Sequence, residues 1–404
     1  MRAVEERDVV IVGGGICGLA TALALHRKGI ESLVLESSNS LRSAGAAITI
    51  RTNGWLALDR LGVGDKIRKN AVPLQAFREQ RLDSRSGMLI KTEGPLSKGE
   101  VRCVKRNELI EALASDLPDG TVCFECHVLH IETDPVTSFP VLQLSSGSTL
   151  KAKVLIGCDG VNSVVLDYLG MNPTKVSCTS AVRGFTSYPN GHKFDNVFTI
   201  AKMDRVILGS VPVNDELVYW FITRLWTSQD STISRDQELI RMQSLKSTQN
   251  FPAQMTEMIR RSDKGSLSSM RFRYRAPWDL VYGRFRKGTA TVAGDALHAM
   301  SPFIGQGGGA SLEDAIVLAR CLSRKLSEVT EEDGEGRRRR KYEEALADYV
   351  EERRMRLLGL SILSYVFNKL SEGPCMVVKI ICVLILIVFF KDRIAHTAFD
   401  CGQL

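Results

Sequence analysis

The sequence lacks the features by which small secreted proteins are recognised. Its ten cysteines are scattered along 404 residues and do not stand at the short, regular spacings of a disulfide framework. It also has no N-x-Ser/Thr sequon, because Asn172-Pro173-Thr174 contains the forbidden proline. Both absences favour a reducing compartment, and we therefore expect a cytoplasmic protein.

Features of nucleic-acid-binding and disordered proteins are also scarce. The net charge is only +7, and 44% hydrophobic with 25% charged residues is typical of a globular protein. The basic run Arg337–Lys341 stands beside the acidic run Glu331–Asp333, as in a solvated helix start, and no aromatic-rich RNA-binding motif accompanies it. We expect no nucleic-acid partner. The length suits two packed domains.

Metal-binding motifs are incomplete. The stretch Cys123-Phe124-Glu125-Cys126-His127 matches the c-type haem attachment pattern, but that chemistry requires export to an oxidising compartment. A zinc site would need a second pair of ligands. Because residues 121–131 alternate like a strand, we interpret the two cysteines as part of that strand and expect no metal.

No apolar run reaches the roughly 20 residues that span a bilayer. Val9–Leu25 follows the acidic flank Glu5–Asp8, so we interpret it as a buried strand and helix and not as a cleavable signal. Met376–Phe390 contains fifteen residues, one of them Lys379. Three interpretations of this segment stay open: a buried C-terminal helix, a membrane-surface or docking helix, and a tail anchor.

The order of the patterns predicts an α/β protein whose first domain is interrupted. Residues 8–36 read as a strand, a helix over 17–29 and a second strand, which together form a βαβ unit. Strand-like runs dominate 178–275, and helical patterns run from there to the end of the chain. We expect a nucleotide-binding domain made of 1–72, 100–178 and 276–330, a β-rich substrate domain made of 73–99 and 179–275, and a C-terminal helical tail over 331–404.

The first candidate site is the glycine turn that follows the first strand. The stretch Gly13-Gly14-Gly15-Ile16-Cys17-Gly18 has the G-x-G-x-x-G spacing. In such a turn Gly13 permits the tight bend, Gly15 lets a pyrophosphate approach the backbone, and Gly18 lets helix and strand pack closely. Glu36 ends the next strand, where a carboxylate can accept hydrogen bonds from a ribose diol. The pattern therefore predicts a dinucleotide site.

A second glycine-rich loop that opens a helix stands nearly 280 residues later. Asp295 follows a strand, and the run Gly305-Gln306-Gly307-Gly308-Gly309 opens a helix. If the first turn binds the ADP half of a cofactor, the second can bind the other end of the same molecule. FAD fits, because its ribityl hydroxyls suit a carboxylate and its flavin ring becomes anionic on reduction, which a helix N-terminus stabilises. NAD would not require the second loop.

These motifs resemble those of the single-component FAD-dependent aromatic hydroxylases, which include salicylate and para-hydroxybenzoate hydroxylases. The plant enzymes related to urate hydroxylase and zeaxanthin epoxidase are the most similar. The resemblance covers about residues 8–325. The motifs that match, in order, are Gly13/Gly15/Gly18 with Glu36, the segment 45–63, Arg106-Asn107-Glu108-Leu109, Gly157-Cys158-Asp159-Gly160-Val161-Asn162-Ser163, and Gly294-Asp295-Ala296-Leu297-His298 with Pro302 and Gly305-Gln306-Gly307.

The resemblance implies a fold and a reaction. The fold is a Rossmann-like FAD-binding domain of the glutathione-reductase (GR2) type, interrupted by a β-sheet substrate domain. The implied reaction uses NADPH or NADH to reduce FAD and O₂ to form a C4a-hydroperoxyflavin, which hydroxylates or epoxidises a small aromatic or otherwise electron-rich molecule. The resemblance also implies that Arg106, Asp159 and Gly160 contact the cofactor and that the Asp-Gly motif serves both nucleotides.

One departure from the family pattern concerns that Asp-Gly motif. The family places an arginine three residues after the motif's serine, whereas here Ser163 is followed at that distance by Leu166. The missing cation puts binding of the reductant in doubt and leaves FAD binding largely intact. A flavin reductase or dehydrogenase without oxygen insertion, and a non-catalytic FAD-stabilised protein, therefore stay open as alternatives.

Residues on the substrate side are less well marked. Arg205 stands in a stretch that resembles the substrate-side Arg-Val-x-Leu of urate hydroxylases, although a surface arginine fits the same pattern. Tyr219–Phe221 can line a pocket, but strand alternation turns at least one of these side chains away. Arg51 is expected either near the flavin or in an exposed loop. His298 is expected to shape its loop more than to transfer protons.

Overall fold

A computed structural model describes residues 5–41, 46–82, 89–234, 236–330, 332–373, 375–392 and 394–404. The strands are β1 Glu5–Val12, β2 Leu33–Leu35, β3 Ala47–Ile50, β4 Ala76–Leu82, β5 Leu89–Gly94, β6 Arg102–Lys105, β7 Val122–Cys123, β8 Val128–Thr133, β9 Pro140–Leu144, β10 Thr149–Gly157, β11 Lys175–Ser187, β12 Val197–Met203, β13 Val206–Asn214, β14 Leu217–Leu225, β15 Ser268–Tyr274, β16 Arg286–Lys287 and β17 Ala290–Val292.

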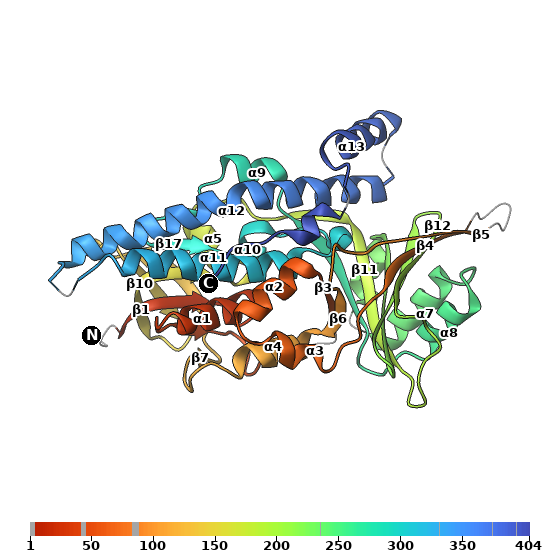
Figure 1. Ribbon diagram of the computed structural model, residues 1–404, viewed down its shortest axis with the longest axis horizontal. Helices are drawn as coiled ribbons and strands as arrows, with labels where there is room; N and C mark the ends of the chain where they lie inside the picture. The colour runs from red at the N-terminus through yellow and green to blue at the C-terminus, as the bar shows by residue number, and fades with distance from the viewer. Residues whose placement is uncertain are drawn as a thin grey trace.

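The helices cover both sheets and make up most of the C-terminal part (Figure 1). They are α1 Ile16–Arg27, α2 Thr52–Arg60, α3 Gly64–Arg68, α4 Arg106–Ala114, α5 Val164–Tyr168, α6 Ser228–Ile233, α7 Gln237–Ser247, α8 Ala253–Arg260, α9 Pro277–Tyr282, α10 Asp295–His298, α11 Gly307–Leu326, α12 Glu335–Ser371 and α13 Met376–Phe389, with 3₁₀ turns η1 Gly160–Asn162, η2 Pro302–Ile304 and η3 Ala395–Ala398.

The first sheet has a parallel centre that brings both glycine motifs to one edge. Its strands follow the order β16-β17-β10-β1-β2-β7, and β1 pairs in parallel with β10 and β2. Residues 9–12 are buried, because a central strand covered on both faces needs a continuous apolar run. The carboxyl ends of β1, β10 and β17 therefore meet where Gly13, Asp159 and Asp295 follow them.

The second sheet is built mainly from the middle of the chain. Its order is β15-β11-β14-β13-β12-β4-β5, with antiparallel pairs except for the parallel pair of β12 and β4. Helices α7 and α8 pack on one face through an apolar cluster that includes Trp220 and Met258. The other face packs toward β6 through a cluster that includes Cys103 and Phe185. This second face therefore looks toward the cofactor domain.

The C-terminal helices lie along the first domain and then leave it (Figure 1). Helix α12 has 37 residues and packs on α11, whereas α13 packs on α12 through a narrow seam in which only Cys382 and Leu386 are buried. The interpretation of α13 as a buried helix is therefore wrong. Among the residues that the structure describes, no helix has the length and apolarity needed to cross a membrane.

The expected α/β fold with C-terminal helices is confirmed. One local expectation is wrong, because the stretch 121–131 is not a continuous strand. It divides into β7 and β8 around a turn in which Glu125 has a φ of +58°, a left-handed conformation that ends strand pairing. A hydrogen bond links this turn to the residue that follows β2, because Cys126 N–H donates to the Glu36 carbonyl at 2.9 Å.

Candidate active site

The β1–α1 turn depends on two glycines. Gly13 has a φ of +104°, and a Cβ at this position would lie 2.5 Å from the Cys158 carbonyl oxygen. A Cβ on Gly18 would lie 1.9 Å from the Gly13 carbonyl oxygen. Gly13 N–H also donates to the Leu35 carbonyl at 2.8 Å. The turn thus closes tightly on the ends of β2 and β10 and fixes the start of α1 at the edge of the sheet.

Gly15, in contrast, faces open space. It is the N-cap of α1, and the nearest atom to a Cβ built there would be Arg106 Nη2 at 4.0 Å. The first N–H groups of a helix have no acceptor inside the helix. An anion beside Gly15 would therefore meet these donors and the Arg106 guanidinium, which is an arrangement suited to a pyrophosphate.

Glu36 is held in one orientation at the end of β2. Its Oε2 accepts from Gly14 N–H at 2.7 Å and its Oε1 accepts from Ser38 N–H at 2.8 Å. The side chain is buried, with 5% of the residue exposed. A carboxylate fixed in this way beside the glycine turn matches the ribose-binding acid of dinucleotide sites.

Asp159 combines a structural role with one unsatisfied oxygen. Its Oδ2 accepts from Val164 N–H at 2.7 Å and so stabilises the start of α5. Its Oδ1 is buried and has no hydrogen-bond partner among the described residues. Burial raises the pKa of this carboxyl above its ordinary value. A buried oxygen without a partner is costly for a protein, so this atom is suited to a ligand donor.

The second loop places an exposed carboxylate beside the start of a long helix. Asp295 is exposed, and its Oδ1 lies 3.8 Å from the position of a Cβ on Gly307. Gly305 adopts the left-handed conformation at φ +59°, which ends η2 and turns the chain into α11. A carboxylate and a helix N-terminus therefore lie together, as expected for the far half of the cofactor.

Arg51 places a cation against this loop, which agrees with the first of the two alternatives stated for it. Its Nη2 lies 3.6 Å from the position that a Cβ on Gly305 would occupy, and its Nη1 donates to the Leu96 carbonyl. Its Nε is buried without a partner among the described residues. Burial lowers the pKa of Arg51 to about 10, which still leaves the group charged at neutral pH. This cation therefore points to a ligand that supplies the missing acceptor.

Comparison with known proteins decides the family. The FAD binding domain family matches residues 6–356. The chain belongs to this family. Monooxygenase 1 of Arabidopsis thaliana is 45% identical over 401 residues, which cover 99% of this chain and 100% of the relative. Aurachin C monooxygenase/isomerase of Stigmatella aurantiaca is 28% identical and matches 78% of this chain and 80% of its own length.

Solved structures confirm the fold. Klebsiella pneumoniae HpxO complexed with FAD and uric acid has a TM-score of 0.77 at 22% identity, and the match covers 98% of this chain and 96% of HpxO. Pseudomonas aeruginosa PqsL has a TM-score of 0.72 at 18% identity over 91% of this chain and 97% of PqsL. The family predicted from the motifs is therefore confirmed, and the protein is an FAD-dependent oxidoreductase of the monooxygenase kind.

The residues at the sheet edge fit FAD. The opening beside Gly15 suits the pyrophosphate and Glu36 suits the ribose. Asp159 Oδ1 and Arg51 Nε, which have no partner among the residues that the structure describes, suit polar groups of a ligand. The individual contacts remain predictions, as do those for Arg106, Gly160, Asp295, Pro302, Gly305 and Gly307. Among these, Arg106 lies beside Gly15 and Asp295 beside Gly307.

Packing within the protein explains the residue type at three of the predicted loop positions. A Cβ on Gly308 would lie 2.1 Å from Ile48 Cδ1, and one on Gly309 would lie 2.8 Å from Asn53 Nδ2. Gln306 is buried and accepts from Asn53 Nδ2 at 2.8 Å. These residues let α11 approach β3 and α2 closely, which does not depend on a ligand. Any cofactor contact they make would use the backbone.

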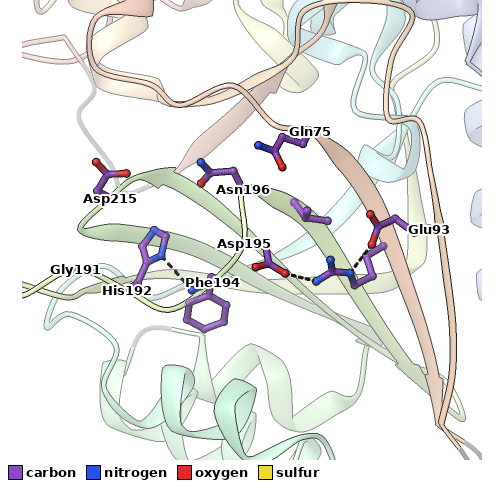
Figure 2. A pocket seen from close by; sticks show the side chains of 10 residues that line it. Gln75, Glu93, Gly191, His192, Phe194, Asp195, Asn196 and Asp215 are labelled. Atoms are coloured by element: carbon purple, nitrogen blue, oxygen red, sulfur yellow. Dashed lines mark hydrogen bonds and ion pairs between the residues drawn. The ribbon is translucent and has the colours of Figure 1, made fainter.

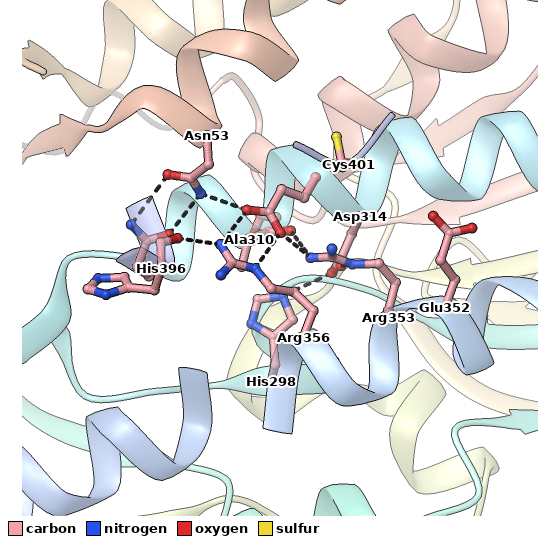
Figure 3. A network of polar contacts seen from close by, with 12 residues as sticks. Asn53, His298, Ala310, Asp314, Glu352, Arg353, Arg356, His396 and Cys401 are labelled. Carbon is pink, nitrogen blue, oxygen red and sulfur yellow. Dashed lines mark hydrogen bonds and ion pairs between the residues drawn. The ribbon is translucent and has the colours of Figure 1, made fainter. Parts of the chain in front are cut away.

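A buried ionic network joins α12 to the start of α11 and to His298 (Figure 3). Arg353 of α12 bonds Asp314 and Glu313 of α11, both at 2.7 Å. Asp314 also contacts His298 Nε2 at 2.9 Å and accepts from Gly294 N–H at 2.9 Å. His298 is fully buried, so the structure supports its expected role in shaping the loop. The network fixes the loop to two helices.

Leu166, the departure from the family pattern, is a core residue here. It is 2% exposed and belongs to the main apolar cluster of the first domain. Its N–H donates to Ser163 Oγ at 2.9 Å, so the turn keeps its N-cap. The position therefore presents its side chain to the core, and the motif folds without the arginine.

The face of the second sheet that looks toward the cofactor domain carries an arginine that the sequence did not single out. Arg183 lies close enough to the Tyr219 hydroxyl to lower its pKa, and it donates from Nε to Ser268 Oγ at 2.9 Å. Tyr219 also packs against Phe185 with the rings tilted by 55° and their centroids 5.4 Å apart. Burial raises the pKa of Tyr219 to about 12, so its hydroxyl stays neutral. Trp220, the next residue along β14, is buried on the opposite face with Nε1 bonded to Thr186.

Arg205, the predicted substrate-side residue, lies elsewhere. It is exposed in the tight turn between β12 and β13. Its guanidinium lies 3.2 Å from the position of a Cβ on Gly373, so it packs on the turn that follows α12. The prediction that it contacts substrate gains no support from this position.

A surface cleft of about 530 Å³ lies beside the second sheet (Figure 2). The cation in this cleft is already paired, since Arg78 bonds Glu93 and Asp195, both at 2.7 Å. His192 Nε2 contacts the Asn214 carbonyl at 2.7 Å. No residue of either glycine loop lines this cleft, so we do not assign the reaction to it.

Replacing Arg51 with methionine is expected to make bound FAD harder to reduce. The reduced flavin is anionic, and the variant lacks the cation beside Gly305 that would stabilise it. We expect the two-electron potential to fall by about 30 mV or more, a tenfold change in the reduction equilibrium. Titration against a reference dye measures it, and Arg51→Lys should restore most of the loss. If both variants keep the wild-type potential, Arg51 does not stabilise the reduced flavin.

Proposed function

We propose that this protein uses NADPH or NADH and O₂ to hydroxylate or epoxidise a small, planar, electron-rich organic substrate. The observation that carries the proposal is the position of the Arg183–Tyr219 pair. It lies on an aromatic face of the second sheet that packs, through Leu96 and Phe185, against the segment that holds Arg51. The cofactor edge and a polar pair among aromatic rings are thus parts of one site.

The chain's own residues would bind and orient the substrate. Arg183 can donate to an anionic or carbonyl oxygen, and the neutral Tyr219 hydroxyl can donate or accept. Phe185 and Phe221 offer ring faces to a flat molecule and exclude water. FAD, when bound, supplies the redox chemistry by which O₂ is activated. The complex of HpxO with uric acid supports a substrate that is planar and rich in carbonyl groups.

Oxygen-18 labelling tests the proposal. The holoenzyme is incubated with NADPH, ¹⁸O₂ and a panel of purines, phenols and quinolones, and the products are analysed by mass spectrometry. We expect one label per product molecule for at least one class. For that substrate Arg183→Met should raise KM about tenfold or more, since a hydrogen bond to a charged donor is lost. Ser268→Ala, which removes only the arginine's structural contact, should leave KM nearly unchanged.

Other outcomes separate the alternatives. Consumption of NADPH with release of hydrogen peroxide and no labelled product for any member of the panel would favour a flavin reductase. A yellow protein that NADPH and NADH both fail to reduce would favour the non-catalytic FAD-bound form. The cytoplasmic location expected from the cysteines stays a prediction.

A further inference from the structure

Helix α13 exposes an apolar surface that the rest of the chain does not cover. Ten large apolar side chains of this helix are between 36% and 75% exposed. We call them the α13 patch: Met376, Val377, Val378, Ile380, Ile381, Val383, Leu384, Ile387, Val388 and Phe389. Scattered apolar side chains are common on protein surfaces, but a contiguous set of this size marks an interaction site.

The helix is held in place by its inner seam. Cys382 and Leu386 face α12, one helical turn apart, and are the buried residues of α13. Helix α12 is itself fixed to the body near its end, where Asn368 accepts from Ser177 at 3.0 Å and from Ser301 at 3.2 Å. Figure 1 shows α13 standing above the end of α12, clear of both sheets. The patch therefore faces outward on a fixed support.

The charged side chains of α13 and of the residue that follows Phe390 have one sign, and the flanking acids Glu372 and Asp392 are paired with Lys369 and Lys98. Residues 376–391 contain no aspartate or glutamate. Lys379 lies in the first turn of α13 and Lys391 follows its end, and both are exposed. Neither lysine has an ion pair among the residues that the structure describes. A partner with apolar depth and an anionic surface is therefore complementary to this helix.

Length and charge position exclude two other occupants. Fourteen residues extend about 21 Å, which is less than the ~30 Å hydrocarbon core, and crossing would bury Lys379. A second copy of α13 would bring lysines together: Lys379 against Lys379 in a parallel pair, and Lys379 against Lys391 in an antiparallel pair. Like charges at these positions oppose self-association.

We propose that α13 is an interfacial anchor that lies in the surface of an anionic lipid bilayer. Its apolar side chains would enter the boundary between headgroups and acyl chains, and Lys379 and Lys391 would reach up to lipid phosphates at its two ends. The substrate sheet and the cofactor edge would stay in water beside the membrane. The inference does not depend on the proposed reaction.

Sedimentation of the full-length holoenzyme with vesicles tests the anchor. Vesicles of phosphatidylcholine with about one third phosphatidylserine are compared with pure phosphatidylcholine. Ile380→Ser/Leu384→Ser/Ile387→Ser should weaken binding to the mixed vesicles about a hundredfold, because the variant lacks three apolar side chains that the bilayer would bury. Lys379→Gln/Lys391→Gln should weaken it about tenfold, and only on the anionic vesicles.

A matched control replaces exposed apolar residues elsewhere. Met242→Ser on α7 and Leu129→Ser on β8, which are 64% and 60% exposed, should leave vesicle binding unchanged. Equal binding of the wild type and the triple α13 variant would overturn the proposal. A second result would also overturn the proposal. If the wild type binds no vesicles, and light scattering shows an oligomer that the triple substitution dissociates, a second copy of the chain covers the α13 patch.

Discussion

Replacing Gly15 with alanine is expected to leave the protein folded but to reduce its affinity for FAD about a hundredfold. The added methyl group meets open space in the protein, with Arg106 Nη2 the nearest atom at 4.0 Å, but it occupies the approach to the N–H groups of α1. A hundredfold loss is about 3 kcal/mol of binding free energy. Gly18→Ala should instead damage the fold, because its Cβ would lie 1.9 Å from the Gly13 carbonyl oxygen.

The two variants are compared with and without added FAD. Fluorescence titration of the flavin-stripped protein gives the affinity, and thermal unfolding of the same protein gives the stability. Gly15→Ala should match the wild type in unfolding free energy without FAD, within about 0.5 kcal/mol. Gly18→Ala should lose at least about 3 kcal/mol. Normal FAD affinity in Gly15→Ala would contradict the assignment of this turn to the pyrophosphate.

Replacing Arg353 with methionine is expected to lower the free energy of unfolding by about 3–5 kcal/mol. The guanidinium is 1% exposed and bonds both Glu313 and Asp314, so the variant leaves two buried carboxylates with fewer partners. Arg340→Met on the same helix is the matched control. Its side chain is 79% exposed and its ion pair with Glu344 is 3.3 Å long, so we expect a change of less than about 1 kcal/mol.

The same network predicts how stability depends on pH. Burial raises the pKa values of Glu313 and Asp314, but the cations around them outweigh burial and hold both values below the ordinary range. A lowered carboxyl pKa gives stability that is present above the unfolded pKa of about 4 and is lost as the pH falls further. Urea unfolding should therefore show this contribution unchanged from pH 7 to 5 and lost below about pH 4. If the free energy of unfolding falls by the same amount below pH 4 in the wild type and in Arg353→Met, this role of the network is contradicted.

The sequence was sufficient to predict that the two glycine loops follow strands of one parallel sheet, whereas their contacts with the cofactor stay predictions. Tight glycine turns restrict the residues that can occupy them, so Gly13 and Gly18 reveal their roles by spacing alone. Glu36 follows because a strand ends at a fixed distance from the turn. Gly308 and Gly309 show where this reasoning is incomplete: the same glycine pattern also serves the close approach of α11 to its neighbours.

The proposed substrate half depends on contacts between residues that are distant in sequence. Arg183 meets Tyr219 only because β11 and β14 pair in the register that sets Phe185 opposite Tyr219. Glu313 and Asp314 look like ordinary charged helix residues until α12 covers them with Arg353. The orientation of α13 could not be derived either, because fifteen apolar residues can pack inward or outward.

Anaerobic titration of the purified protein with NADPH tests the central claim most directly. The absorbance of the bound flavin is followed in the visible band, first without oxygen and then after admission of air. We predict that NADPH, or NADH in its place, bleaches the flavin and that air restores its colour, because the site binds FAD and the Asp-Gly motif folds without the family's arginine. A purified protein that neither contains flavin nor binds added FAD would contradict the account.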